Sequence, residues 1–507
     1  MSSKTRQQKQ DDREIKRFND IISGRVKVAD IPRPKKPSQA NRIGGGAKAE
    51  EKDEMAGSYM RLLRILMPGM LASISRVDDY RSQRRITHTL PVIILYGLLI
   101  FLCHIKSRRG ANREIGGSEL AALMKEIIPD FVSIPHADTL ERLMERISAD
   151  DLESRYEEII TEFIKSDEFR KLNPGLLKVA IDGTQKFSRD YCWDENALSR
   201  NAGDPDVERY YAYMLESVLI LENGMVLPLL TETLENGEKL DSNGKQDCET
   251  KAFKRLTNRL VKLLGKGCVT VLVDGLYASG PVISICQNYC WQYLIALKAD
   301  CLTSVWDDFY GLQKIESDNE LEMTHGERYQ LYRWSNGIEY TYGNNHKRLA
   351  LNVVTCKEIW EEKSPVKNKP KLRVTEYAWL SSSEITPNNA FKFCSTARSR
   401  WRIENHFLVT KHQGYYYEHC LTYNWNAMKA YHCLMKVAFM LNCLISNSQL
   451  MTEYVAAEGK RWMIEKVWNF LIHHSISDIK SLSEPDQSKT NRHRSKIRFK
   501  DLKLTAA

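Results

Sequence analysis

Two short apolar runs decide the fold class of this 507-residue chain: LLKVAIDGT at residues 176–184 and VTVLVDG at residues 269–275. Each run has the length and β-branched content of a buried strand, and each ends in an aspartate followed by a glycine. Around them the pattern predicts strands at 210–221, 225–233 and 291–297, and helices at 247–264 and 280–289. This order of strands and helices is typical of an α/β domain with a mixed sheet.

Asp182 and Asp274 are the two aspartates that close these runs. Side chains at the carboxyl ends of strands in an α/β sheet converge on the usual site region, so both are candidate site residues. Either aspartate alone has a common structural explanation, because aspartate also forms turns and caps helices. The repetition of the strand-Asp-Gly unit is what favours a functional role.

A third carboxylate lies in a strongly helical stretch, ARSRWRIENHFLVTK at residues 397–411. At ~100° per residue, Arg400, Glu404 and Lys411 lie within about 40° of one another on such a helix. Trp401 and Leu408 share an apolar side roughly 90° away, so we expect the helix to pack against the sheet with its polar strip in a cleft. The alternative is a solvated face on which Arg400 and Glu404 form an i,i+4 ion pair.

The two strand-Asp units and the Arg-x3-Glu-x6-Lys helix resemble the DDE transposases of bacterial insertion sequences. The closer resemblance is to the group with a tyrosine–arginine–glutamate–lysine signature and a β-strand insertion before the glutamate. Arg400, Glu404 and Lys411 match the spacing of this signature, whereas its tyrosine position holds Ala397. Residues 245–249 and 411–415 are also similar to this group, and the resemblance covers about residues 135–445.

The resemblance implies an RNase H-like fold in which Asp182, Asp274 and Glu404 are catalytic and bind Mg²⁺, with Mn²⁺ as a substitute. Carboxylates are donors that Mg²⁺ prefers, and a pair of ions ~4 Å apart suits phosphodiester cleavage. Arg400 and Lys411 would hold the DNA phosphates near the cut. The expected enzyme is a transposase that cleaves the ends of an insertion sequence and joins the 3′-hydroxyls to target DNA.

Its expected partners are terminal inverted repeats and target DNA, bound by a homodimer or a larger synaptic assembly. Two other functions stay open at this point. One is an RNase H-like DNA nuclease without strand transfer, and the other is a non-catalytic DNA-binding protein descended from a transposase. The second is disfavoured because binding alone requires no set of three carboxylates.

Composition shifts along the chain indicate five parts. We expect a flexible basic arm at 1–55, an all-helical DNA-binding or assembly domain at 56–166, the catalytic domain at 167–300 and 386–445, a β-rich insertion at 301–385, and a C-terminal helical segment with a basic tail at 446–507. The arm has few apolar residues from which to build a core. Within the insertion, the pattern predicts strands at 329–334, 338–342, 349–355 and 372–380, with a turn at 335–337.

The overall charge agrees with a nucleic-acid partner, since Lys and Arg number 74 against 65 Asp and Glu. The basic loop at 106–109 is a candidate DNA contact. The 12 cysteines form no CxxC pair and indicate reduced thiols. The longest apolar run, at 90–104, is shorter than the ~20 residues that span a bilayer and predicts a buried helix. We therefore expect no membrane contact and an intracellular protein. The resemblance to transposases of bacterial insertion sequences implies a cytoplasmic location at the nucleoid.

Overall fold

The computed structural model describes residues 6–33, 49–201, 208–236, 245–316, 318–362, 371–473 and 496–505. The chain forms two compact units. The first unit combines Met1–Gln39 with Thr270–Arg400, and the second combines Ala40–Val269 with Trp401–Ala507. This division differs from the one we expected, because the region expected to be the catalytic domain contributes to both units.

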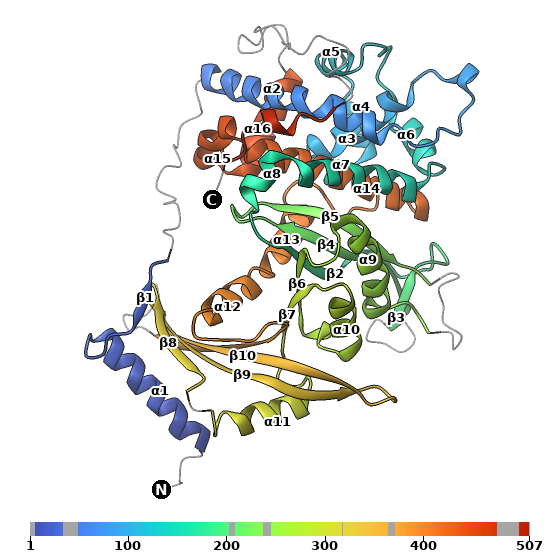
Figure 1. Cartoon of the computed structure of the whole chain (residues 1–507). Coiled ribbons are helices and arrows are strands. Elements are labelled where there is room, and N and C mark those ends of the chain that lie inside the picture. The colour runs from blue at the N-terminus through green and yellow to red at the C-terminus, as the bar shows by residue number, and fades with distance from the viewer. Residues whose placement is uncertain are drawn as a thin grey trace. The chain divides into compact units, whose positions relative to one another are not determined.

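A helical body makes up much of the second unit (Figure 1). Its helices are α2 (Ala49–Ile74), α3 (Leu90–Leu102), α4 (Arg108–Glu114), α5 (Ser118–Ile127), α6 (Ala137–Met144), α7 (Ala149–Lys165), α8 (Asp167–Leu172), α14 (Trp425–Ser446), α15 (Thr452–Glu458) and α16 (Lys460–His473). The helical pattern predicted for residues 56–166 is confirmed, and the C-terminal helices complete the same body. Of the expected basic tail, residues 474–495 lie outside the described residues.

Helix α3 is the apolar run that we expected to be a buried helix, and that prediction is confirmed. A helix that is apolar on all sides must be covered on all sides. Here α14, α2 and α6 pack against α3, and nearly all of its residues are buried. No helix in the described part of the chain is long and apolar enough to cross a membrane.

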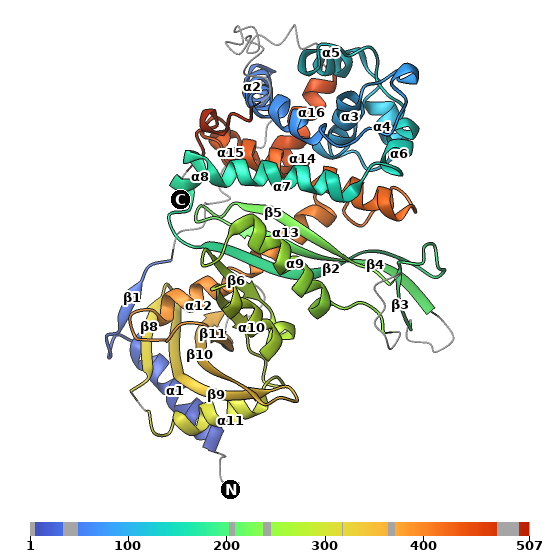
Figure 2. The same ribbon diagram turned by 45° about the vertical axis from the view of Figure 1, so that its right-hand side comes forward.

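The second unit also carries an antiparallel group of strands, over which α7 and α14 lie (Figures 1 and 2). Its elements are β2 (Leu177–Arg189), β3 (Leu198–Asn201), β4 (Glu208–Ile220), β5 (Val226–Leu234), α9 (Glu249–Leu264) and α13 (Trp401–His412). Strand β4 pairs with β2, β3 and β5. The predicted strands at 210–221 and 225–233 are confirmed, and Gly224 makes the turn between them at φ +84°.

The first unit is built on a mixed sheet. Its elements are α1 (Arg6–Ile22), β1 (Ala29–Ile31), β6 (Val269–Val273), η2 (Gly275–Tyr277), α10 (Gly280–Asn288), β7 (Gln292–Ala296), α11 (Thr303–Leu312), β8 (Glu320–His325), β9 (Arg328–Tyr342), β10 (Lys347–Glu362), β11 (Lys371–Ser381) and α12 (Ala390–Arg398). The strand order is β1-β8-β9-β10-β11-β7-β6, parallel at β1–β8 and β6–β7 and antiparallel elsewhere. Because β11 pairs with β7, the strands expected in the insertion continue this sheet.

One predicted turn of the insertion is wrong. Ser335, Asn336 and Gly337 do not separate two strands but lie inside β9, which runs without a break to Tyr342. The pairing with β10 shifts register between Leu351 and Val353, so an extra residue bulges there. A bulge absorbs turn-forming residues without ending the strand.

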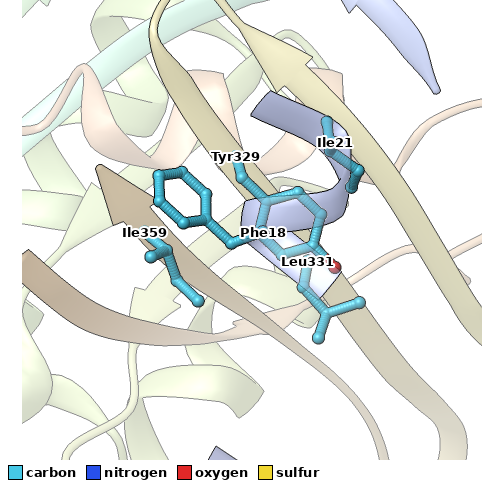
Figure 3. Close-up of a cluster of buried hydrophobic side chains, with 5 residues drawn as sticks. All are labelled: Phe18, Ile21, Tyr329, Leu331 and Ile359. Carbon is cyan, nitrogen blue, oxygen red and sulfur yellow. The ribbon is translucent and has the colours of Figure 1, made fainter. Parts of the chain in front are cut away.

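Helix α1 lies within the segment 1–55, in which we expected a flexible arm. Phe18 and Ile21 pack against Tyr329, Leu331 and Ile359, and Phe18 is only 1% exposed (Figure 3). A few apolar residues suffice because α1 adds them to an existing sheet face. Acidic residues of α1 also pair with the sheet: Glu14 lies 2.6 Å from Lys357 Nζ and 2.9 Å from Arg333 Nη1. Residues 34–48 of the expected arm lie outside the described residues.

Candidate catalytic site

Asp182 is a half-buried residue within β2. We expected the strand to end there, but β2 continues to Arg189 because residues 183–189 also pair with β4. Asp182 is directly opposite Glu216 of β4. Residues directly opposite in an antiparallel pair project from the same face of a sheet. Asp182 and Glu216 therefore share one face of the second unit's strands.

Gly183 projects to the opposite face, toward α9. A Cβ atom there would lie 2.6 Å from the ring of Tyr213 and 2.7 Å from the carboxyl carbon of Glu249. These two residues are joined, since the Tyr213 hydroxyl donates to Glu249 Oε1 at 2.8 Å. The glycine after Asp182 is thus explained by close packing rather than by a turn. Tyr213 is a neighbour of Asp182 that the sequence did not reveal, whereas Glu249 ends the stretch 245–249 that resembles the family.

Glu216 is the second acidic residue on the Asp182 face, and it is 3% exposed. Its carboxylate accepts hydrogen bonds from Tyr417 Oη and Thr231 Oγ1, each at 2.8 Å. His432 Nε2 of α14 lies 2.9 Å away. Burial by itself raises the pKa of this carboxyl, but the neighbouring His432 and Lys436 outweigh it and lower the pKa overall.

These partners of Glu216 offset the repulsion between its carboxylate and that of Asp182. Two carboxylates directly opposite each other repel, unless one of them is compensated by other groups. Glu216 interacts with Thr231 of β5, His432 of α14 and Tyr417 of the segment after α13. Asp182 Oδ1 accepts a hydrogen bond from the backbone N–H of Gly183 at 2.9 Å. Glu216 was not predicted from the sequence, because its partners come from distant segments.

Asp274 belongs to the first unit, directly after β6. Its Oδ1 accepts a hydrogen bond from the backbone N–H of Leu276 at 2.9 Å and so caps the short helix η2. Lys298 Nζ lies 3.6 Å from its other oxygen. Asp274 therefore has the structural role of a helix cap. Its side chain is also 28% exposed, so the carboxylate is accessible from solvent.

The helix expected over residues 397–411 is broken. Helix α12 ends at Arg398 and α13 begins at Trp401, so Arg400 lies in the turn between them and not on the helix of Glu404. Glu404 and Lys411 do share α13, and at seven residues apart they lie about 20° from each other. Ala397, at the tyrosine position of the signature, is buried in α12.

The face of α13 that packs inward is also not the one we expected. Trp401 and Leu408 are 58% and 51% exposed, while Ile403, His406 and Thr410 are buried. Helix α13 packs against β2 and β5 through this second stripe. The prediction that Trp401 and Leu408 face inward was wrong, because the elements packed around α13 decide which of its side chains are buried. One such neighbour is Phe439, whose ring centre lies 4.5 Å from that of His406.

Two family models match the chain. One, described as DDE_Tnp_1-associated, matches residues 71–159, which contain α3 to α6 and the first part of α7. The other, described as Transposase DDE domain, matches residues 245–443, which contain Asp274 and Glu404. The chain belongs to the DDE transposase family. No curated protein is similar enough to this transposase to count as a match.

Membership of this family supports a transposase function, with a nuclease or transferase role and DNA as the substrate. DDE transposases generally use divalent metals. The donor types in this transposase suit such an ion, since Asp182, Asp274 and Glu404 all offer hard carboxylate oxygens. Within the described ranges, no three or more His, Cys, Asp or Glu side chains form a group that could hold a metal.

The structure brings some of the predicted site residues together. Asp182 and Glu404 belong to the second unit, on elements that pack against each other, and Lys411 lies on the same helix as Glu404. Asp274 and Arg400 belong to the first unit. Lys411 Nζ is 2.8 Å from Glu418 Oε1, an ion pair that the sequence pattern did not suggest.

Proposed function

We propose that this transposase cleaves the ends of an insertion sequence and joins the freed 3′-hydroxyls to target DNA. The main support is the packing of α13 on β2, which places Glu404 and Asp182 on neighbouring elements of one unit. The match to the transposase domain model adds support for Asp274 and Glu404. The proposal includes an RNase H-like catalytic domain and an inserted module at residues 301–385.

In this proposal Asp182, Asp274 and Glu404 hold divalent cations, Mg²⁺ with Mn²⁺ as a substitute. When bound, the ions would polarise the scissile phosphodiester and favour attack by water or a 3′-hydroxyl. The chain itself supplies the positioning. The compensated Glu216 carboxylate holds Tyr417, and so fixes the segment that follows α13 against the face on which Asp182 lies.

Arg400 and Lys411 would contact the phosphates beside the cut. Lys411 is 18% exposed and its partner Glu418 is 47% exposed, so the ammonium is held at the surface. A phosphate can replace such a half-exposed partner because both are anionic oxygen acceptors. The DNA partners would be the terminal inverted repeats and the target, and the active form a homodimer or larger synaptic assembly.

The experiment uses the full-length protein and a duplex that carries a terminal repeat with flanking DNA. Asp182→Ala, Asp274→Ala and Glu404→Ala should each abolish strand cleavage in Mg²⁺ while DNA binding stays largely intact. Glu453→Gln, which alters an exposed carboxylate on α15, is the control and should cut normally. Near-normal cleavage by any one of the three alanine variants would remove that residue from the site.

A second assay supplies pre-cut ends with free 3′-hydroxyls and a target plasmid. Joining of the ends is the expected result. Cleavage without joining would instead identify a nuclease, and binding without either reaction would identify a non-catalytic DNA-binding protein.

A further inference from the structure

A groove of about 810 Å³ lies in the helical body of the second unit. One wall is the segment 80–88 between α2 and α3, and the other is formed by residues 139–146 of α6 and the turn that follows it. Four arginines line the groove, Arg81, Arg85, Arg142 and Arg146, against one carboxylate, Glu145. This part of the chain lies within the residues matched by the DDE_Tnp_1-associated model.

Three of these arginines are available to a ligand. Arg85, Arg142 and Arg146 are exposed, and none of them forms an ion pair with another residue that the structure describes. Arg81 is different, because it binds Asp79 through two hydrogen bonds of 2.8 and 2.7 Å. The groove therefore has an excess of positive charge at its surface.

The two walls are tied together. The Tyr80 hydroxyl donates to the backbone carbonyl of Arg142 at 2.8 Å, and the guanidinium of Arg146 lies 5.6 Å from the centre of the Tyr80 ring. Arg81 also donates to the backbone carbonyl of His88 at 3.0 Å, which closes the loop on itself. Groups held in place before binding lose less conformational entropy when a ligand arrives.

We propose that this groove binds the sugar–phosphate backbone of duplex DNA. Guanidinium groups are planar forks that match phosphate oxygens in pairs. A protein partner fits less well, because protein interfaces have an apolar core, and the only large exposed hydrophobic side chain in this lining is Tyr80. The inference rests on the proposed function in one respect, that the transposase acts on DNA.

The groove is distinct from the basic loop at 106–109, which we also expected to contact DNA. In that loop Arg108 lies 3.4 Å from Glu141, and Ser107 is used as the N-cap of α4. The charge of Arg108 is thereby partly neutralised. The groove has more exposed guanidinium groups on a more fixed support.

The test is DNA binding by the full-length protein, measured by fluorescence anisotropy at several salt concentrations. The probes are a terminal-repeat duplex and an unrelated duplex of equal length. Arg85→Gln and Arg146→Gln should each weaken binding to both duplexes about tenfold and reduce the salt slope by about one. Arg113→Gln, an exposed arginine of α4 outside the groove, should leave the slope unchanged.

Several outcomes would overturn the proposal. The first is that Arg85→Gln and Arg146→Gln have the same salt slope as the wild type. The second is that they lose no more affinity for DNA than Arg113→Gln does. The third is that they lose affinity for the terminal repeat alone, which would indicate that these arginines read bases. Thermal melting checks folding, and Arg85→Gln keeps the test valid if Arg146→Gln disturbs Tyr80.

Failure of the groove and failure of the catalytic proposal give different results. Unchanged slopes with cleavage lost in Asp182→Ala would refute only the groove. Reduced slopes with normal cleavage by Asp182→Ala would refute only that site assignment.

Discussion

Replacing Lys186 with methionine should raise the free energy of unfolding of this transposase at pH 7. Lys186 lies on β2, four residues after Asp182, and is 7% exposed. Its ammonium donates to the backbone carbonyl of Tyr417 at 3.2 Å and lies 4.5 Å from the centre of the Tyr417 ring. Burial lowers the pKa of this lysine to about 8, although the nearby Glu216 partly offsets the effect.

The size of the effect follows from that pKa. A change from 10.5 to about 8 corresponds to ~3 kcal/mol of destabilisation when the ammonium is kept charged in the folded state. Methionine has a similar length and no charge, but it loses the hydrogen bond to Tyr417, which contributes ~1 kcal/mol. We therefore expect Lys186→Met to be more stable than the wild type by about 2 kcal/mol at pH 7.

The pH dependence gives the sharper test. Below pH 8 the lysine is protonated in both folded and unfolded chains, so the full penalty is present. Between pH 8 and 10.5 the unfolded chain binds more protons at this site than the folded chain does, so this site makes the wild type more stable as pH rises. The advantage of Lys186→Met should thus shrink across this window and reverse near its upper end, where the neutral lysine still donates to Tyr417 and the methionine does not.

Urea unfolding at a series of pH values measures this difference. Lys165→Met, at an exposed position of α7, is the control and should show no pH-dependent difference from the wild type. The explanation would be refuted if Lys186→Met were less stable at pH 7, or if its difference from the wild type stayed constant from pH 7 to 10.

Two further predictions concern contacts that the sequence did not reveal. Phe18→Ala should destabilise the docking of α1 by ~3 kcal/mol, because it empties a buried aromatic site; faster trypsin cleavage within residues 6–22 is the expected sign, and wild-type protease resistance would contradict it. Arg402→Ala removes the hydrogen bond to the Gly224 carbonyl at 2.9 Å and should cost ~1 kcal/mol in thermal melting while cleavage stays normal; loss of cleavage with an unchanged melting temperature would place Arg402 in the site.

The local residue pattern was sufficient to predict those helices and strands whose boundaries are not changed by contacts with distant segments. Helix α3 and strands β5 and β7 form where their apolar runs predicted them. Asp182 and Asp274 were also found as candidates from the sequence, because an acidic residue after an apolar run is visible without any knowledge of contacts. Glu404 was found from its spacing to Arg400 and Lys411. Helix α13 was located, although its start was not.

Errors arose where distant segments decide the local structure. The pattern at residues 397–411 has helical spacing throughout, yet the chain turns at Ser399 and Arg400. Residues 335–337 are typical of a turn, but Ser335 and Ile338 pair with β10, and the bulge between them keeps the strand β9 continuous. Helix α1 has few apolar residues of its own and is held by the sheet on which it packs.

The amino-acid sequence by itself therefore determined those helices and strands whose own residue pattern is sufficient, such as α3, β5 and β7, together with the family resemblance and the three candidate carboxylates. Only the tertiary structure decided which buried charged groups have hydrogen-bond partners or opposite charges beside them. Glu216 is bound by Thr231, Tyr417 and His432, which are separated from it by 15, 201 and 216 positions in the chain. The cost of burying a charge depends on its partners in space, and sequence spacing carries no record of them.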